Sequence, residues 1–102
     1  MLALRPNCEL CDKDLPPDST EACICSYECT FCASCVEEVL HNVCPNCGGG
    51  FSARPIRPTV ARRAETSLDY DPASTTRVHT KYSPEEIQAF VDAVKAIPPS
   101  RR

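Results

Sequence analysis

The sequence has no long hydrophobic run. No stretch of its 102 residues approaches the about 18–20 apolar residues that a membrane-spanning helix needs. The start of the chain, Met-Leu-Ala-Leu-Arg-Pro-Asn-Cys, also lacks an apolar run long enough for a secretory signal peptide. We therefore expect a cytoplasmic protein with no membrane association, in a compartment where thiols stay reduced and available to metal.

Basic side chains are scarce in the first half of the chain. Residues 1–50 contain two of them, Arg5 and Lys13, against eight acidic side chains, which gives a net charge of -6. Residues 51–102 contain nine basic and six acidic side chains, a net charge of +3. Because metal-bound thiolates would make the first half still more negative, we do not expect it to bind nucleic acid.

Known catalytic signatures are absent as well. The sequence contains no Ser-His-Asp set, no phosphate-binding loop and no dinucleotide-binding fingerprint. We therefore expect a protein that is not an enzyme.

Cysteine, in contrast, is abundant. Nine cysteines lie within residues 8–47, and the repeated Cys-x2-Cys steps among them favour metal sites over a disulfide framework. Eight thiolates would make two tetrahedral four-sulfur sites, for which two Zn²⁺ ions are the expected cofactors. Such closed sites leave no position for water or substrate, which excludes a catalytic zinc. The eight predicted ligands are Cys8, Cys11, Cys25, Cys29, Cys32, Cys35, Cys44 and Cys47.

Metal is also needed for stability. A segment of about fifty residues buries little apolar surface, so its core alone is marginal. A structural zinc ion contributes about 10–16 kcal/mol of apparent binding free energy, much of it expressed as folding. The candidate core residues are Leu2, Leu4, Leu10, Leu15, Ile24, Tyr27, Phe31, Val36, Val39, Leu40, Val43 and Phe51.

Short elements are predicted around the cysteines. Residues 21–29 are expected to form a strand that enters a tight turn, because Ile24 and Tyr27 favour β-structure. Residues 33–43 are expected to form a helix, with one apolar face at i, i+3, i+4 and i+7. That face consists of Val36, Val39, Leu40 and Val43.

The second half divides into a linker and a helix. Residues 52–82 are rich in proline and arginine and are predicted to be a mostly irregular linker. Residues 83–98 are predicted to form an amphipathic helix, because Ser83 and Glu86 make a capping box and Pro84 suits the first turn. Its apolar stripe would pack on the cysteine-rich module, a second copy or a partner. The stripe consists of Ile87, Phe90, Val91, Val94 and Ile97.

Three features resemble the RING finger family. Leu10 stands inside the first Cys-x2-Cys step, where RING fingers favour an aliphatic residue. Cys29-Thr-Phe-Cys32-x2-Cys35 resembles a segment that usually begins with histidine, and Cys44-Pro-Asn-Cys47 is similar to the closing Cys-Pro-x-Cys. The resemblance implies a small α+β domain over residues 1–51. Such a domain has a treble-clef, cross-braced fold with a short β-hairpin and one helix.

The resemblance also implies how the ligands are shared. In a RING the pairs interleave, which assigns Cys8, Cys11, Cys32 and Cys35 to one ion and Cys25, Cys29, Cys44 and Cys47 to the other. The alternative is sequential, with Cys8, Cys11, Cys25 and Cys29 followed by Cys32, Cys35, Cys44 and Cys47. Spacing alone does not decide between the two arrangements.

A longer resemblance covers residues 1–58. This segment looks like a family of short, cysteine-rich bacterial proteins described only as a domain of unknown function, which implies zinc binding and no established activity. The dipeptide Arg54-Pro55 also matches the pattern of this family. The other matching segments are Leu4-Arg-Pro-Asn-Cys8, Cys11-Asp12, Asp14-Leu-Pro-Pro-Asp-Ser19, Ile24-Cys-Ser26, Glu28-Cys-Thr-Phe-Cys32 and Cys44-Pro-Asn-Cys-Gly-Gly49.

Three further residues have other candidate roles. Cys23 is not required by the family pattern, so we expect a free thiol beside the metal site, with the alternatives of a ligand in place of Cys25 or a redox-reactive thiol. His41 is expected to be an exposed helix residue, since eight cysteines leave it no ligand position. His79 is expected to lie solvated in the linker.

The function that we expect is a structural zinc module for protein–protein interaction, with oligomerisation possible through the C-terminal helix. One alternative is a nucleic-acid-associated regulator that uses Arg54, Arg57, Arg62 and Arg63. Another is a ubiquitin-ligase-like adaptor whose partner would grip Leu10 and Pro45. The chain lacks the tryptophan that many such ligase surfaces use.

Overall fold

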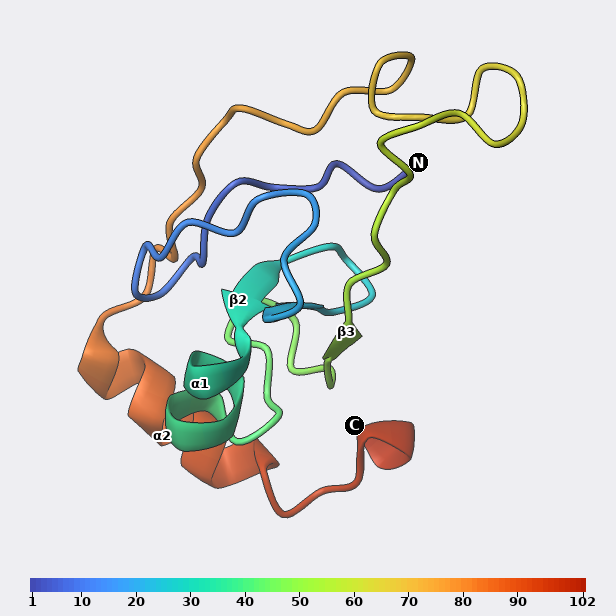
Figure 1. Cartoon of the computed structure of the whole chain (residues 1–102). Coiled ribbons are helices and arrows are strands. Elements are labelled where there is room, and N and C mark those ends of the chain that lie inside the picture. The colour runs from blue at the N-terminus through green and yellow to red at the C-terminus, as the bar shows by residue number, and fades with distance from the viewer.

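A computed structural model describes all of residues 1–102 and confirms the small α+β fold (Figure 1). Strands β1 (Ala22–Ile24) and β2 (Thr30–Cys32) form the predicted antiparallel hairpin. A third strand that the sequence did not predict, β3 (Ser52–Ala53), pairs antiparallel with the other side of β1. The sheet order is therefore β2-β1-β3.

The helix after β2 is shorter and wider than predicted. A single α-helical turn, α1 (Ala33–Cys35), continues into a π-helical turn, η1 (Val36–Leu40). The helix ends at Leu40 because His41 and Asn42 take positive φ angles of 46° and 61°. A π turn holds more residues than an α turn, so it rotates Val39 outward to 40% exposure while Leu40 stays fully buried.

The core is small and is built largely from cysteine. Phe31 and Phe51 meet edge to face, with ring centroids 5.4 Å apart. Together with the cysteines, the aliphatic side chains of the sheet, the turns and the C-terminal helix complete one cluster. Its buried members are Cys8, Leu15, Ala22, Cys25, Cys29, Phe31, Cys32, Cys35, Leu40, Val43, Cys44, Ile87 and Val91.

The C-terminal helix α2 (Pro84–Val94) packs against η1 of the same chain (Figure 1). The predicted capping box is present, because Ser83 Oγ accepts from Glu86 N at 3.2 Å and Glu86 Oε1 accepts from Ser83 N at 3.1 Å. Ile87 and Val91 are buried in the core of the cysteine-rich module. Of the three proposed docking sites for the stripe, the structure therefore uses the module itself. No helix is long and apolar enough to span a membrane.

Gly48 lies beside α2 in a left-handed backbone conformation. Gly48 has a φ of +79°, and a Cβ added there would lie 3.3 Å from Phe90 Cζ. We expect Gly48→Ala to lower the stability of the metal-loaded protein by about 1–2 kcal/mol, because the left-handed conformation disfavours a side chain. Thermal unfolding followed by circular dichroism would measure this loss. Gly49→Ala is the matched control, and equal losses for the two variants would contradict the explanation.

Two arginines of the predicted linker are internal clamps. The Arg54 guanidinium is buried and donates to the carbonyl oxygens of Arg5, Leu15 and Pro16 at 2.8–3.2 Å. Arg57 donates to the carbonyl oxygens of Leu2 and Asp71 at 2.8 and 2.7 Å. Both side chains therefore hold the irregular segments of the chain together.

Residues 74–80, here called the strap, return along the N-terminal segment (Figure 1). Arg77 fixes the strap by donating to Asp12 Oδ1 and Asp14 Oδ1, both at 2.8 Å. Hydrogen bonds from Arg77, and then from His79, hold the pKa of Asp12 below its ordinary value. The backbone contacts are Ser74 N to Ala3 O, Thr80 N to Glu9 O, and a reciprocal pair between Val78 and the Asn7 side chain.

We expect Arg77→Ala to loosen the strap without changing the metal content. The measurement is amide hydrogen exchange, which should become faster at Val78 and Thr80, whose N–H groups bond to Asn7 and Glu9. Added salt should have the same effect on the unmodified protein, because the Arg77 ion pairs are solvent-exposed and therefore screened. Arg63→Ala is the control, and unchanged exchange in Arg77→Ala would show that Arg77 does not hold the strap.

Candidate metal centres

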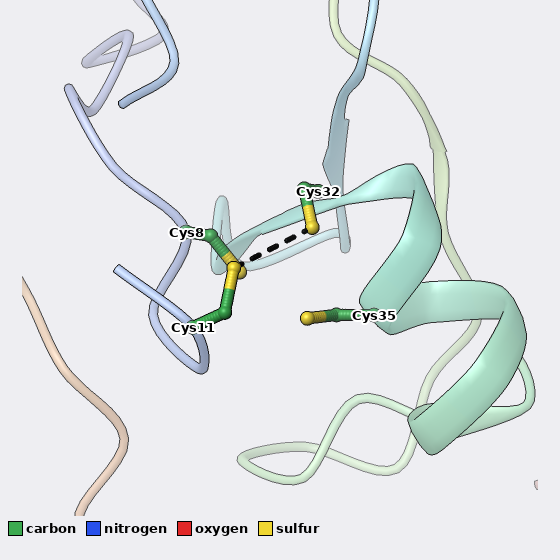
Figure 2. A group of neighbouring side chains, drawn as sticks. All are labelled: Cys8, Cys11, Cys32 and Cys35. Atoms are coloured by element: carbon green, nitrogen blue, oxygen red, sulfur yellow. Dashed lines mark hydrogen bonds between the residues drawn. The ribbon is translucent and has the colours of Figure 1, made fainter. Parts of the chain in front are cut away.

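Four cysteine sulfurs converge on one point beside the sheet. The Sγ atoms of Cys8, Cys11, Cys32 and Cys35 all lie within 4.8 Å of one another. Figure 2 shows that Cys8 and Cys11 reach this point from the N-terminal loop, and Cys32 and Cys35 from the end of β2 and from α1. Strand β2 and helix α1 thus position two of the four sulfurs, those of Cys32 and Cys35.

The spacing of these sulfurs fits a metal ion. Cys11 Sγ and Cys32 Sγ are 3.7 Å apart. Tetrahedral coordination with Zn–S bonds of about 2.3 Å places two sulfurs about 3.8 Å apart, whereas a disulfide bond is about 2.05 Å long. All nine cysteines are free thiols. The cluster therefore has the geometry of ligands around an ion.

A second cluster contains Cys25, Cys44 and Cys47, again within 4.8 Å of one another. The predicted fourth ligand, Cys29, is buried but does not share this spacing. It lies against this cluster, since its carbonyl accepts from Cys25 N at 3.1 Å. Burial raises the pKa of Cys29, whereas a hydrogen bond with the Asn46 side chain lowers that pKa. The structure thus gathers seven of the eight predicted ligands into two groups and leaves Cys29 beside the second.

Backbone amides point at the sulfurs of the second cluster. Tyr27 N donates to Cys25 Sγ at 3.3 Å, and Gly49 N donates to Cys47 Sγ at 3.4 Å. Both donors lie two residues after the cysteine, where a tight turn brings the amide back towards the side chain. These bonds orient the sulfurs and stabilise the thiolate form that binds metal.

The thiolate forms of both clusters need a cation to stabilise them. Burial raises the pKa of Cys35, and hydrogen bonding with Cys32 and the charge of Cys8 add to the effect. Burial likewise raises the pKa of Cys44, against opposing backbone hydrogen bonds. Buried thiols cannot ionise together unless a positive charge compensates them, and a divalent ion supplies that charge. The donor sets therefore fit a soft divalent metal ion.

The two clusters interleave along the chain. The first cluster joins Cys8 and Cys11 to Cys32 and Cys35. The second joins Cys25 to Cys44 and Cys47. The sequential alternative would have joined Cys25 to Cys8 and Cys11, and it is therefore wrong. Metal ions bound to interleaved clusters would link the first and the last Cys-x2-Cys steps to the hairpin between them. Such links would stabilise the fold of a short chain.

The other candidate ligands lie outside both clusters. Cys23 is half-buried on β1, and burial raises the pKa of its thiol. His41 is exposed at the end of η1. His79 Nε2 lies 2.9 Å from Asp12 Oδ1 in the strap. The structure therefore offers none of the three as a ligand.

Sequence reasoning missed Glu9. Its side chain is 3% exposed and lies inside the first Cys-x2-Cys step, where it bonds to both halves of the module. A single glutamate between two ligand cysteines has no recognisable sequence pattern, so only the fold identifies it.

Known proteins are similar to this chain over more than half of its length. The family described as "Protein of unknown function (DUF1272)" matches residues 1–57. The chain belongs to the DUF1272 family. An uncharacterized protein of Rhizobium meliloti is 58% identical to it over 78 residues, which cover 76% of this chain and 86% of the relative. Because this aligned segment is longer than the family match, the similarity extends past the DUF1272 segment. No solved structure matches the chain.

Proposed function

We propose that this DUF1272 protein is a zinc-scaffolded module for protein–protein interaction, with one Zn²⁺ in each interleaved cysteine cluster and Cys29 as the fourth ligand of the second. One observation carries the proposal. Six of the thirteen core residues are predicted ligand cysteines, so the metal sites are the core of the domain. Ions in such positions act as structural supports for the surface around them.

Zinc is the metal that the donor set supports best. Four thiolates in tetrahedral array suit Zn²⁺ or an iron–sulfur centre. Spacing near 3.7 Å between Cys11 and Cys32 suits four sulfurs around a single ion. A catalytic role for the ion is disfavoured, because thiolates alone fill the coordination sphere and leave no position for water.

The hairpin turn offers the best contact site for a partner. Tyr27 is 73% exposed at this turn, and its backbone N–H is bonded to the Cys25 sulfur. The second cysteine cluster therefore fixes the backbone from which this exposed aromatic side chain projects. Tyrosine is enriched at interfaces, and the net charge of -6 over residues 1–50 favours a partner with a basic face.

The proposal is tested in two steps. Elemental analysis should find two zinc ions and no iron per chain. Cross-linking in the cells that naturally contain the protein should capture a partner, whose binding to the purified protein is then measured by calorimetry. Tyr27→Ser should weaken binding at least tenfold, as expected for loss of an aromatic anchor. Tyr70→Ser, at a second exposed tyrosine, should not. A metal-free protein that binds the partner equally well would contradict the proposal.

Neither alternative function gains support from the geometry. Residues of α2 and the segment before it, Tyr82, Ile87 and Phe90, line the pocket beside Pro45, where a conjugating enzyme would have to dock. The nucleic-acid alternative uses four arginines, but Arg54 and Arg57 are already bonded to internal carbonyl groups. Both observations favour the interaction module over these alternatives.

A further inference from the structure

Glu9 connects the two metal clusters. Its buried carboxylate accepts hydrogen bonds from Arg5 Nη1 at 2.9 Å and Thr30 N at 2.7 Å through Oε2. Through Oε1 it accepts a third bond, from Asn46 Nδ2 at 3.2 Å. A buried carboxylate is costly unless its partners are in place, so these contacts form as a set.

The hydrogen bond between Glu9 and Asn46 joins residues from the segments of two different cysteine clusters. Glu9 itself stands between Cys8 and Cys11 of the first cluster, whereas Asn46 stands between Cys44 and Cys47 of the second. Thr30 lies in β2, and its carbonyl oxygen also accepts from Glu9 N at 2.9 Å. The Glu9–Asn46 contact is therefore a direct bridge between the first and last Cys-x2-Cys steps.

We propose that Glu9 is a positioning residue that couples the two sites, so that the first ion bound raises the affinity for the second. This inference rests on the proposed zinc sites. An ion at either site orders one Cys-x2-Cys step and brings one end of the bridge into place. The other end then docks onto a preformed partner, which lowers the ordering cost of the second site.

Native mass spectrometry of the full chain with one equivalent of zinc tests the coupling. The unmodified protein should populate mainly the metal-free and two-zinc forms. Asn46→Ala should raise the ratio of the squared one-zinc population to the product of the metal-free and two-zinc populations at least about fivefold, which is the factor that a typical coupling free energy corresponds to. Because Asn46 is exposed, this substitution leaves the core intact and the protein able to fold.

Control variants separate coupling from stability. Asn42→Ala alters an exposed asparagine whose side chain accepts from Phe51 N and makes no hydrogen bond to Glu9, and it should keep the one-zinc form scarce. Asn46 also influences the Cys29 thiol. For that reason, Glu9→Ala and the double variant are included, and the double should resemble Glu9→Ala alone. If the double variant adds the two single effects, or if Asn42→Ala matches Asn46→Ala, the coupling does not pass through Glu9.

The outcomes also separate this inference from the proposed function. A chain that binds no zinc removes the proposed function itself. A chain that binds two zinc ions independently, with the one-zinc form abundant before any substitution, keeps the zinc sites and overturns only the coupling.

Discussion

Replacing Cys32 with serine is expected to unfold residues 1–51. Cys32 is buried in the first cluster, and without its thiolate that site lacks one of four ligands. A structural zinc contributes about 10–16 kcal/mol, which equals or exceeds the about 5–15 kcal/mol of net stability of a typical domain. Loss of most of that contribution leaves no folded state. The measurement is dispersion in the ¹H–¹⁵N NMR spectrum together with zinc content.

Cys23→Ser provides the matched control. Cys23 lies on the neighbouring strand β1 and belongs to neither cluster. The same chemical change there should leave both zinc ions bound and the spectrum dispersed. A Cys23→Ser protein that loses an ion, or a Cys32→Ser protein that keeps two, would contradict the assignment of ligands.

Replacing Arg54 with alanine is expected to cause the next largest loss. Three carbonyl groups would lose their donor, and the buried one, on Leu15, would stay unsatisfied at a cost of about 1–3 kcal/mol. Each of the two part-buried bonds, to Arg5 and Pro16, adds about 0.5–1.5 kcal/mol, so we expect a total loss of about 2 kcal/mol or more, or at least roughly 8 °C in Tm at about 4–8 °C per kcal/mol. Thermal unfolding of the zinc-loaded protein would measure this.

Arg62→Ala is the control for the arginine clamp. Arg62 is exposed in the same basic segment, so its removal should change stability by no more than about 0.5 kcal/mol. Equal effects of the two substitutions would mean that Arg54 acts through general charge and not through its hydrogen bonds.

The cysteine clusters could be predicted because their signal is local. A Cys-x2-Cys step places two sulfurs on one side of a tight turn whatever the rest of the chain does. Which pairs share an ion depends on the path of the backbone, and only the resemblance to RING fingers indicated interleaving. The displacement of Cys29 from the second cluster had no signal in the sequence.

The C-terminal helix was predictable for a similar reason. Its capping box joins Ser83 and Glu86, three residues apart, and its stripe follows the helical period. The partner of that stripe was not predictable, because packing on η1 depends on residues about fifty positions earlier in the chain. The position of Gly48 beneath Phe90 became evident only once α2 was docked.

The internal hydrogen bonds of Arg54 and Arg57 were not predicted from the composition of residues 52–82. A proline-rich segment with several arginines has the composition of a flexible linker. Arg54, however, donates to carbonyl groups 38–49 residues away in sequence, and Arg57 to one 55 residues away. Contacts at such separations leave no periodic pattern. The role of Glu9 was not predicted for the same reason, since its partner Asn46 lies 37 residues away in the sequence.

The most direct test of two interleaved metal sites is NMR of the protein loaded with ¹¹³Cd. Long-range couplings connect each cadmium to the β-protons of its own cysteine ligands. We predict two cadmium signals. One couples to Cys8, Cys11, Cys32 and Cys35, and the other couples to Cys25, Cys44 and Cys47 together with Cys29. A cadmium signal shared by Cys8, Cys11 and Cys25, or a spectrum with no cadmium bound, would contradict the account.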